Sequence, residues 1–380
     1  MIDVRLVTDR RSRRQFIDLP YRKYRGDPHW IPPARLTEVP QFDPARNPFL
    51  AVADMDLFLG WDGDRIVGRI AAIDDHRHNE QRHENLAAFG FFEADTAEAA
   101  AALFATVERW AAARGRSTLR GPLSPSLNYV AGLQIDAFDT DPFVMMACNP
   151  PEYVGYVEDA GFRKAKDLYC WLLDLRREDV RYAAVAERIR RRYSVTIRPV
   201  DFSRLRRESD TMYAIYCDAW EQNWGFVPPT REEFWGIVKD LRLLRMRDAI
   251  LIAEVDGRPV GCITVIPDVN QVLKGTNARL LPTGWYRLLT MKRRVTRGRL
   301  MTAGMIEEYR ERGVVSALMA EVFRVSRRLG FTELECSWIL EDNHLPNHSL
   351  RKLGATMYKT YRLYEKRVPA AARADAPARG

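Results

Sequence analysis

The 380-residue sequence contains few cysteines and no long apolar run. Its five cysteines are scattered and form no CxxC pair, which excludes a disulfide framework and a zinc ribbon and favours a reducing compartment. No apolar stretch approaches the roughly 20 residues that a membrane-spanning helix needs. Residues 1–14 also lack the apolar segment of a signal peptide. We therefore expect a cytosolic protein.

The charge leans positive without being extreme. Lysine and arginine number 59 against 51 acidic residues, a net charge of +8, which favours an anionic partner such as nucleic acid, a membrane surface or a phosphorylated cofactor. Hydrophobic residues at 46% and charged residues at 29% are typical of globular proteins, which excludes wholesale disorder and a coiled coil. At roughly 100–200 residues per domain, the length predicts two domains.

A strand pair with an Asp-Gly turn occurs twice in the chain. Residues 55–73 read as two strands joined by such a turn, and residues 249–266 repeat the order. Gly68 and Gly261 occupy the same place in the two hairpins. The repeat is weak, but it indicates an internal duplication.

Each half continues with the same order of elements. The first hairpin is followed by a strand near 89–92, an alanine-rich helix over 96–114 and a strand at 118–120. The second is followed by strand 300–305, helix 314–329, strand 333–339, helix 346–353 and strand 357–365. Each half therefore reads β-β-β-α-β-α-β, which predicts an α/β fold.

A charged run divides the two halves. We assign residues 1–175 to the first domain, 176–192 to a charged helical linker with a solvated face, and 193–367 to the second domain. Residues 368–380 lack aromatics and have one large aliphatic side chain, so we predict a disordered tail.

The segment 308–318 joins a strand to a helix through basic residues and a glycine. Arg310, Arg312 and Gly313 stand where the N–H groups of a helix start are unpaired, where the helix dipole favours negative charge and where glycine allows close approach. The spacing matches neither the P-loop nor the dinucleotide-binding fingerprint. The segment therefore predicts a pyrophosphate site outside the NTPase and dehydrogenase classes.

On these residues the sequence resembles the GNAT superfamily of acyl-CoA N-acyltransferases. The family signature, Arg or Gln-x-x-Gly-x-Gly or Ala, is matched by Arg310 and Gly313, whereas Val315 replaces its small last residue. The resemblance implies acyl-CoA as donor substrate, no metal, and a donor site at Met305, Arg310, Arg312, Gly313, Val314, Val315 and Ser316, with a backbone N–H near Met305 polarising the thioester carbonyl. The family's general-acid tyrosine falls on Leu350, so another group or water must protonate the leaving thiolate.

A closer resemblance covers nearly the whole chain. The sequence is similar to a bacterial family of tandem-GNAT proteins that includes the ceramide synthases, through the segments Asp27–Pro33, Asn47–Phe49, Gly90–Glu93, Arg120–Pro122, Asn149–Tyr153, Gly161–Asp167, Ser337–Asn343 and Tyr358–Tyr361. The resemblance implies two tandem GNAT-like domains, each a mixed, mostly antiparallel sheet flanked by helices. It also implies transfer of a fatty acyl group from acyl-CoA to the amine of a long-chain (sphingoid) base.

The first half lacks a counterpart of the phosphate turn. Acidic residues at 93–95 lead into its helix, where they cap the helix but repel a pyrophosphate. We predict a degenerate copy that helps to wall the acceptor pocket, with Asn79, Asn149 and Tyr153 as candidate substrate contacts.

An amine must lose a proton before it attacks a thioester, so a base should lie near the seam between the fourth and fifth strands of the second half. Glu341 is the preferred base and Glu335 a second candidate, with Asn343 and Tyr358 completing the predicted catalytic set. The alternatives are that Glu341 pairs with a basic side chain and that Tyr358 only packs within its strand.

Histidine pairs do not indicate a metal site. His344 and His348 are four residues apart with a proline between them, and His76, His78 and His83 stand in a polar stretch over 74–85 that we predict to be a solvated loop.

The insertion over 268–299 carries the prediction about the substrate's environment. Trp285 and Tyr286 stand beside a basic cluster, a combination typical of segments that lie at a lipid surface. The cluster comprises Lys292, Arg293, Arg294, Arg297 and Arg299. We expect peripheral contact with an anionic membrane; a buried helix with a charged end is the alternative reading.

Other functions stay open at this point. They are a GNAT enzyme acting on a small amine or amino acid, and a non-catalytic or tRNA-dependent tandem-GNAT protein that binds RNA. Nucleic acid is the weaker partner because no recognised binding module accompanies the basic cluster. An acyl carrier protein is an alternative carrier of the acyl donor.

Overall fold

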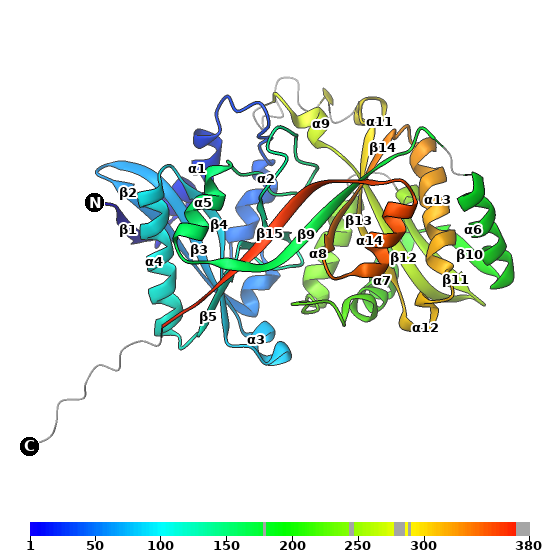
Figure 1. Ribbon diagram of the computed structural model, residues 1–380, viewed down its shortest axis with the longest axis horizontal. Coiled ribbons are helices and arrows are strands. Elements are labelled where there is room, and N and C mark those ends of the chain that lie inside the picture. The colour runs from blue at the N-terminus through cyan, green and yellow to red at the C-terminus, as the bar shows by residue number, and fades with distance from the viewer. Residues whose placement is uncertain (178–179, 243–246, 277–285, 288–289, 370–380) are drawn as a thin grey trace, which may run out of the picture.

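One large mixed sheet runs through the whole molecule. The computed structural model describes residues 1–177, 180–242, 247–276, 286–287 and 290–369. The strands follow one another across the sheet in the order β1-β2-β3-β4-β5-β15-β9-β14-β13-β12-β11-β10, with the two halves of the chain at its two ends (Figure 1).

The first half supplies one end of this sheet. Its strands are β1 (Asp3–Leu6), β2 (Ala53–Asp62), β3 (Arg65–Asp75), β4 (Leu86–Ala94), β5 (Thr118–Gly121), the short β6 (Leu123–Ser124), β7 (Val130–Ala131) and β8 (Leu133–Gln134), and the long β9 (Arg163–Asp174). Its helices are α1 (Arg10–Lys23), α2 (Arg35–Glu38), α3 (His76–Arg82), α4 (Ala97–Ala113) and α5 (Glu152–Asp159), with 3₁₀ turns at Val39–Phe42 and Pro48–Ala51.

The second half supplies the other end. Its strands are β10 (Val195–Pro199), β11 (Ile250–Val255), β12 (Arg258–Pro267), β13 (Arg297–Met305), β14 (Glu333–Leu340) and β15 (Thr356–Arg367). Its helices are α6 (Val180–Arg192), α7 (Leu205–Trp220), α8 (Arg231–Leu241), α9 (Asn270–Leu273), α11 (Met291–Arg294), α12 (Glu307–Arg310), α13 (Val314–Arg328) and α14 (His344–Lys352), with 3₁₀ turns at Phe202–Arg204 and Arg247–Ala249.

The duplication predicted from the hairpins is visible in the strand pairing. Both Asp-Gly hairpins form, as β2-β3 and β11-β12. In each half the next strand pairs in parallel with a strand that follows a helix: β4 with β5, and β13 with β14. Both parallel pairs separate early, since β4 meets β5 only as far as Ala88 and β13 meets β14 only as far as Leu300. Each half therefore contains a V-shaped opening between two parallel strands.

The two halves exchange their last strands. β9, from the first half, pairs with β14 of the second, while β15, from the second half, pairs with β5 of the first. β9 and β15 also pair with each other in antiparallel fashion, and the two run side by side across the middle of the molecule (Figure 1). The sheet therefore has no break at the linker predicted for 176–192, of which residues 180–192 form α6.

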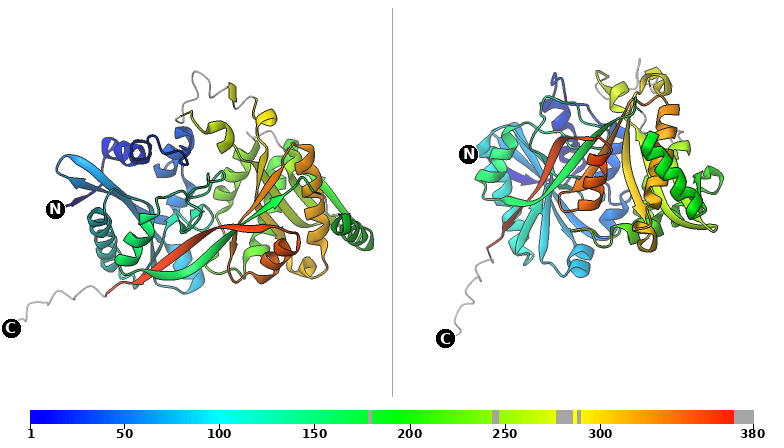
Figure 2. Two further views of the ribbon diagram at one scale, coloured as in Figure 1. Left: turned by 45° about the horizontal axis from the view of Figure 1, so that its top comes forward. Right: turned by 45° about the vertical axis from the view of Figure 1, so that its right-hand side comes forward.

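Helices cover both faces of the sheet. α4 starts at the N-cap Thr96 and buries Leu103, Phe104 and Val107 against the first half. In the second half α13 packs on one face, where α6 lies beside it (Figure 2), and the core formed by α7 and α8 covers Ile252 and Cys262 on β11 and β12. In the second half, each face of the sheet therefore packs against its own apolar core.

One local prediction is wrong. Residues 76–82, expected within a solvated loop, form α3, which the carboxylate of Asp75 caps through the N–H groups of Arg77 and His78. The N-cap aspartate stabilises a helix that polar composition alone did not reveal.

Candidate functional site

The opening between β13 and β14 contains a cleft of about 260 Å³. Its walls come from the sheet, from α7 and α8, and from the loop over 127–129 of the first half. Most of its lining side chains are apolar, among them Met212, Tyr216, Phe234, Val238 and Met301. A cleft between separated parallel strands with apolar walls suits an extended chain that carries a reactive group.

A β-bulge lies on the floor of the cleft. Thr264 of β12 stands opposite Thr302, whereas the next residue, Val265, stands opposite Leu300, so Met301 is an extra residue without a partner on β12. A bulge locally interrupts the hydrogen-bond ladder and leaves the extra residue unpaired. Met305, predicted to polarise the carbonyl, stands opposite Gly261 further along the same strand. Sequence reasoning did not identify the bulge.

A buried polar cluster lies at the point where the strands separate. Ser337 donates a hydrogen bond of 2.8 Å to Oε2 of Glu335, and Arg299 Nε donates one of 3.0 Å to the Ser337 hydroxyl. Tyr358 donates to the other carboxylate oxygen of Glu335. Burial raises the pKa of Glu335 despite the opposing effect of nearby Arg299, and burial likewise raises that of Tyr358.

Ser337 connects this cluster to the cleft. Arg299 and Ser337 line the cleft, whereas Glu335 and Tyr358 are not among its lining residues. Two predicted catalytic residues are therefore brought together, and Ser337, which the sequence analysis did not single out, is the group between Glu335 and the open space.

Glu341, the base preferred from the sequence, lies elsewhere. Its carboxylate pairs with Lys164 at 2.6 Å and accepts the backbone N–H of Asp167 at 3.1 Å, and it does not line the cleft. These contacts match the alternative prediction, in which Glu341 pairs with a basic side chain. Asp342 pairs with Lys166, while Asn343 lines the cleft at the start of α14.

The predicted phosphate turn forms the start of α13. Gly313 is the N-cap with a φ of +74°. Arg310 bridges β13 and α7, donating to the backbone oxygen of Met305 at 3.1 Å and to the carboxylate of Asp218 at 2.9 Å. Within the described part of the chain, no acceptor is bonded to the N–H groups of Gly313, Val314 or Val315. Three free N–H groups at the start of a four-turn helix suit an anion.

The remaining members of the turn differ in exposure. Arg312 is exposed, lies over the ring of Tyr309 and has Glu308 at 3.7 Å, so its charge is available at the surface. The Ser316 N–H bonds to the Gly313 oxygen, so it is not free.

The substrate contacts predicted in the first half do not line the cleft. Asn79 bonds to Leu86 in both directions, Asn149 bonds to Gln134 in both directions, and the buried Tyr153 bonds to Glu93. Each side chain braces its own half of the molecule.

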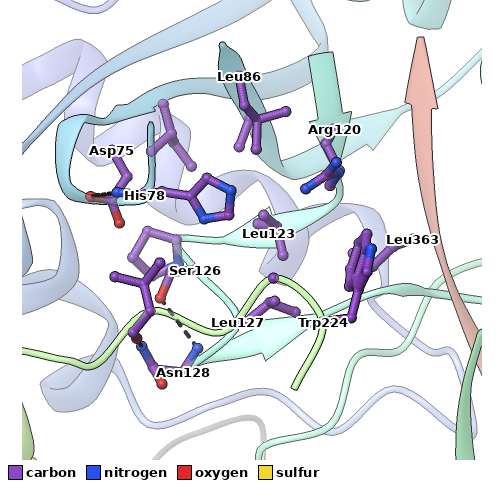
Figure 3. Close-up of a pocket in the computed structure, with 15 residues that line it drawn as sticks. Asp75, His78, Leu86, Arg120, Leu123, Ser126, Leu127, Asn128, Trp224 and Leu363 are labelled. Carbon is purple, nitrogen blue, oxygen red and sulfur yellow. Dashed lines mark hydrogen bonds between the residues drawn. The ribbon is translucent and has the colours of Figure 1, made fainter. Parts of the chain in front are cut away.

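The first half has a second, nearly filled opening between β4 and β5. Its free volume is only about 30 Å³. Figure 3 shows the side chains that line it. Trp224, from the segment between α7 and α8, enters this opening and lies beside Arg120, whose guanidinium is 4.6 Å from the ring centre. In Figure 3, His78 lies across the opening from Trp224. His78 is 3.0 Å from Glu84, and hydrogen bonding from His78 and the charge of Arg120 lower the pKa of Glu84 to about 2.

Side chains of the first half hold the α7–α8 segment at several points. Arg77 of α3 pairs at 3.0 Å with Glu233, whose side chain is fully buried, and Tyr129 donates to the same carboxylate. Asn128 donates to the oxygen of Val227 at 2.9 Å. The first half therefore positions one wall of the second half's cleft.

The basic insertion is only partly at the surface. Tyr286, Arg293 and Arg294 are exposed, whereas Trp285 and the side chain of Lys292 lie outside the described residues. The expectation that Arg297 and Arg299 reach a lipid surface is wrong. Arg297 pairs at 2.5 Å with the buried Asp268, and Arg299 is 5% exposed at the base of the cleft. Both stand within β13, whose pairing draws them into the fold.

No group of three or more His, Cys, Asp or Glu side chains in the described part of the chain is arranged to hold a metal ion. Within the same residues, no helix combines the length and apolarity required to cross a bilayer.

Comparison with known proteins identifies relatives of the whole chain. The acetyltransferase (GNAT) family profile matches residues 209–355. The chain is 34% identical over 374 residues to protein YghO of Escherichia coli (strain K12), covering 96% of this chain and 95% of that protein. It is also 34% identical over 365 residues to the bacterial ceramide synthase of Caulobacter vibrioides (strain NA1000 / CB15N), covering 93% and 94% of the two chains.

Solved structures share the fold at low sequence identity. A tandem GNAT protein from the clavulanic acid biosynthesis pathway aligns with a TM-score of 0.56 at 14% identity, covering 98% of this chain and 100% of that one. A GCN5-related N-acetyltransferase from Sphaerobacter thermophilus aligns with a TM-score of 0.52 at 14% identity, covering 97% of both chains.

Proposed function

The chain belongs to the GNAT family of acyl-CoA-dependent N-acyltransferases, and from this premise we propose that it transfers a fatty acyl group to the amine of a long-chain, sphingoid-type base. The observation that carries the proposal is the apolar cleft between β13, β14, α7 and α8. Its phenylalanine, methionine and valine side chains solvate hydrocarbon, at roughly 0.8 kcal/mol for each buried methylene. The name of the Caulobacter relative is consistent with this substrate class.

The donor is placed by the turn at the start of α13. The free N–H groups of Gly313, Val314 and Val315 and the exposed Arg312 bind the diphosphate of acyl-CoA. Arg310 holds this turn against α7 through Asp218. From there the pantetheine arm runs into the opening between β13 and β14, which carries the thioester to the bulge at Met301.

Proton removal proceeds through the buried cluster. The acceptor amine donates its proton to the Ser337 hydroxyl, which passes its own proton to Glu335 across the 2.8 Å hydrogen bond. A carboxyl whose pKa is raised by burial is a stronger base than an exposed one. Tyr358 holds the second carboxylate oxygen in place. Glu341 keeps its structural role with Lys164 in this scheme.

Bond exchange then follows. The amine nitrogen bonds to the thioester carbon, and a backbone N–H of β13 at the bulge stabilises the negative oxygen of the tetrahedral intermediate. When the intermediate collapses, the carbon–sulfur bond breaks. The thiolate takes up the proton that the nitrogen loses as the amide forms, transferred through Ser337 or a water molecule, and Glu335 releases the proton of the ammonium group to solvent.

The membrane supplies the acceptor in this proposal. Tyr286, Arg293 and Arg294 present an aromatic ring and two cations at the surface of the insertion. Such a surface contacts anionic headgroups without a spanning helix.

The test is a product assay with purified full-length protein. Radiolabelled palmitoyl-CoA is incubated with sphinganine, with 3-oxosphinganine and, as the small-amine comparison, with spermidine, and the products are resolved by thin-layer chromatography and mass spectrometry. We expect a labelled long-chain amide. Acylation of spermidine alone supports the small-amine alternative and contradicts the proposal, as does salt-sensitive retention of tRNA without any acyl transfer.

A further inference from the structure

A buried hydroxyl without a partner among the described residues lies in the floor of the cleft. Thr264 of β12 is fully buried and lines the cleft, and its Oγ1 has no hydrogen-bond partner among the described residues. Its neighbours on the same face of the strand, Cys262 and Ile266, belong to the apolar core under α7 and α8. A hydroxyl therefore interrupts an otherwise apolar row.

This hydroxyl differs from the other buried atoms without partners. In the described part of the chain these are Nε of Arg69 and Nε of Arg77. Each guanidinium still donates through another nitrogen, Arg69 to the Phe16 oxygen and Arg77 to Glu233. Thr264 has one polar side-chain atom, and no group in the described part of the chain bonds to it. Valine has nearly the same shape and would remove the desolvation cost, so the hydroxyl brings no benefit to the fold.

The position of Thr264 relates it to the reacting groups. It stands opposite Thr302, one residue from the bulge at Met301, and it borders the same cleft as Arg299 and Ser337. The proposed reaction brings the acceptor amine to Ser337. A substituent on the carbon next to the amine-bearing carbon then lies in the same cleft, whose lining includes Thr264.

We propose that Thr264 is a specificity-determining residue whose hydroxyl binds an oxygen substituent on the acceptor carbon next to the amine-bearing carbon. The acceptor class is a long-chain 2-amino alcohol or 2-amino ketone as opposed to a plain alkylamine. The inference rests on the proposed function. A threonine hydroxyl donates and accepts hydrogen bonds, so it serves a hydroxyl or a keto oxygen alike.

The experiment uses two acceptors that differ only in this oxygen: 2-amino-octadecan-3-ol and 2-amino-octadecane. With saturating palmitoyl-CoA, we measure kcat/KM for both in the wild-type protein, Thr264→Val, Thr264→Ser and Thr302→Val. We expect the wild type to prefer the amino alcohol by about tenfold or more, because a buried site built for an oxygen is left unpaired by the analogue that lacks it. Thr264→Val should abolish the preference by lowering kcat/KM for the amino alcohol alone. Thr264→Ser, which keeps a hydroxyl, should restore the preference.

Binding is measured separately from turnover. Both amines compete with a dansyl-labelled long-chain amine for the protein. Thr264→Val should weaken binding of the amino alcohol about tenfold without weakening binding of the alkylamine. Its melting temperature should equal or exceed that of the wild type, which separates recognition from folding. The inference is overturned if Thr264→Val lowers kcat/KM for both acceptors equally, raises KM for acyl-CoA or leaves the preference intact. It is also overturned if Thr302→Val abolishes the preference.

Different results would contradict the proposed function and the inference about Thr264. If neither long-chain amine is acylated by the wild type, the proposed function is wrong. The competition assay then still decides the inference about Thr264, because equal binding of the two amines by wild type and Thr264→Val overturns it without reference to catalysis.

Discussion

Replacing Glu335 by glutamine removes the proposed base while keeping its shape. The glutamine carbonyl retains one of the hydroxyl donors, Ser337 or Tyr358, and its amide group opposes the other, so one hydrogen bond is lost. Arg299, 3.9 Å from the carboxylate, loses a nearby negative charge but keeps its bonds to Ser337 and to the Val144 oxygen. These losses amount to about 2–4 kcal/mol of unfolding free energy, and a chain of this size should remain folded.

Glu335→Gln should lose far more activity than its small loss of unfolding free energy would explain. A positioned general base contributes typically 10²–10⁴-fold, so we expect Glu335→Gln to lower kcat/KM by about that factor with little change in the affinity for CoA. Ser337→Ala should show a similar loss, because it interrupts the same proton path while the carboxylate stays in place. The assay is steady-state acyl transfer, with CoA affinity measured by calorimetry.

The pH dependence follows from burial. Because burial raises the pKa of Glu335, kcat/KM should rise with pH through that raised value, and Glu335→Gln should lack this rise. Stability should change in the opposite direction. Between the unfolded pKa near 4.5 and the raised folded pKa, the folded state binds the extra proton, so the contribution of Glu335 to stability falls as pH rises. Urea unfolding across this range should show the slope in the wild type and its loss in the variant.

Glu341→Gln is the matched control, since it removes a carboxylate that pairs with Lys164 outside the cleft. Its kcat/KM should stay within a few-fold of the wild type. Near-normal turnover in Glu335→Gln together with a large loss in Glu341→Gln would refute the assignment of Glu335 and return the base to Glu341.

Three further predictions concern the donor turn, the contact between halves and the membrane. Gly313→Ala should lower CoA affinity in calorimetry and cost about 1–2 kcal/mol in urea unfolding, because φ is +74° and the added Cβ meets Ile189 at 3.0 Å. Arg77→Met should cost about 3 kcal/mol in unfolding and reduce acyl transfer with CoA affinity unchanged, because it leaves the buried carboxylate of Glu233 without its cation. Arg293→Gln with Arg294→Gln should weaken binding to anionic vesicles about 30-fold in sedimentation, at about 1 kcal/mol for each cation.

Each of these variants has a control within the chain. Gly257→Ala has a similar φ, +76°, with nothing within 4 Å of the added Cβ, so it should keep its CoA affinity; equal loss in both variants would point to general strain. Arg82→Met removes another α3 arginine, and a cost equal to that of Arg77→Met would contradict the ion-pair argument. Arg191→Gln with Arg192→Gln removes two exposed cations of α6, and an equal loss of vesicle binding would show a non-local charge effect.

Local features of the fold were accessible from the sequence. The Asp-Gly hairpins, the helix over 96–114 and the helix after Gly313 have periodicity, caps and turns that depend on neighbouring residues. The family resemblance was likewise visible in short motifs, and the comparisons confirm it. The error over residues 74–85 arose where a single capping aspartate outweighed polar composition.

The candidate site was harder to predict from the sequence than these local elements. Glu335 and Tyr358 were candidates, but their contact joins β14 to β15, and β9 from the first half lies between these two strands in the sheet. Ser337 stood in a family segment without an assigned role, and Thr264 and the bulge at Met301 carry no motif, because threonine and methionine are common in strands and only pairing register reveals their environment. Arg299 reads as one cation of a surface cluster until its strand is placed.

The sequence by itself determined which family the chain belongs to, where the turn at the start of α13 lies and which segments form the two hairpins, because these depend on contacts within a few residues or on motifs. Only the tertiary structure decided that β9 and β15 are exchanged between the halves, that Trp224 enters the first opening and that an apolar cleft remains in the second. These features depend on pairing between residues far apart in the chain, whose free energy is gained only when the whole sheet assembles.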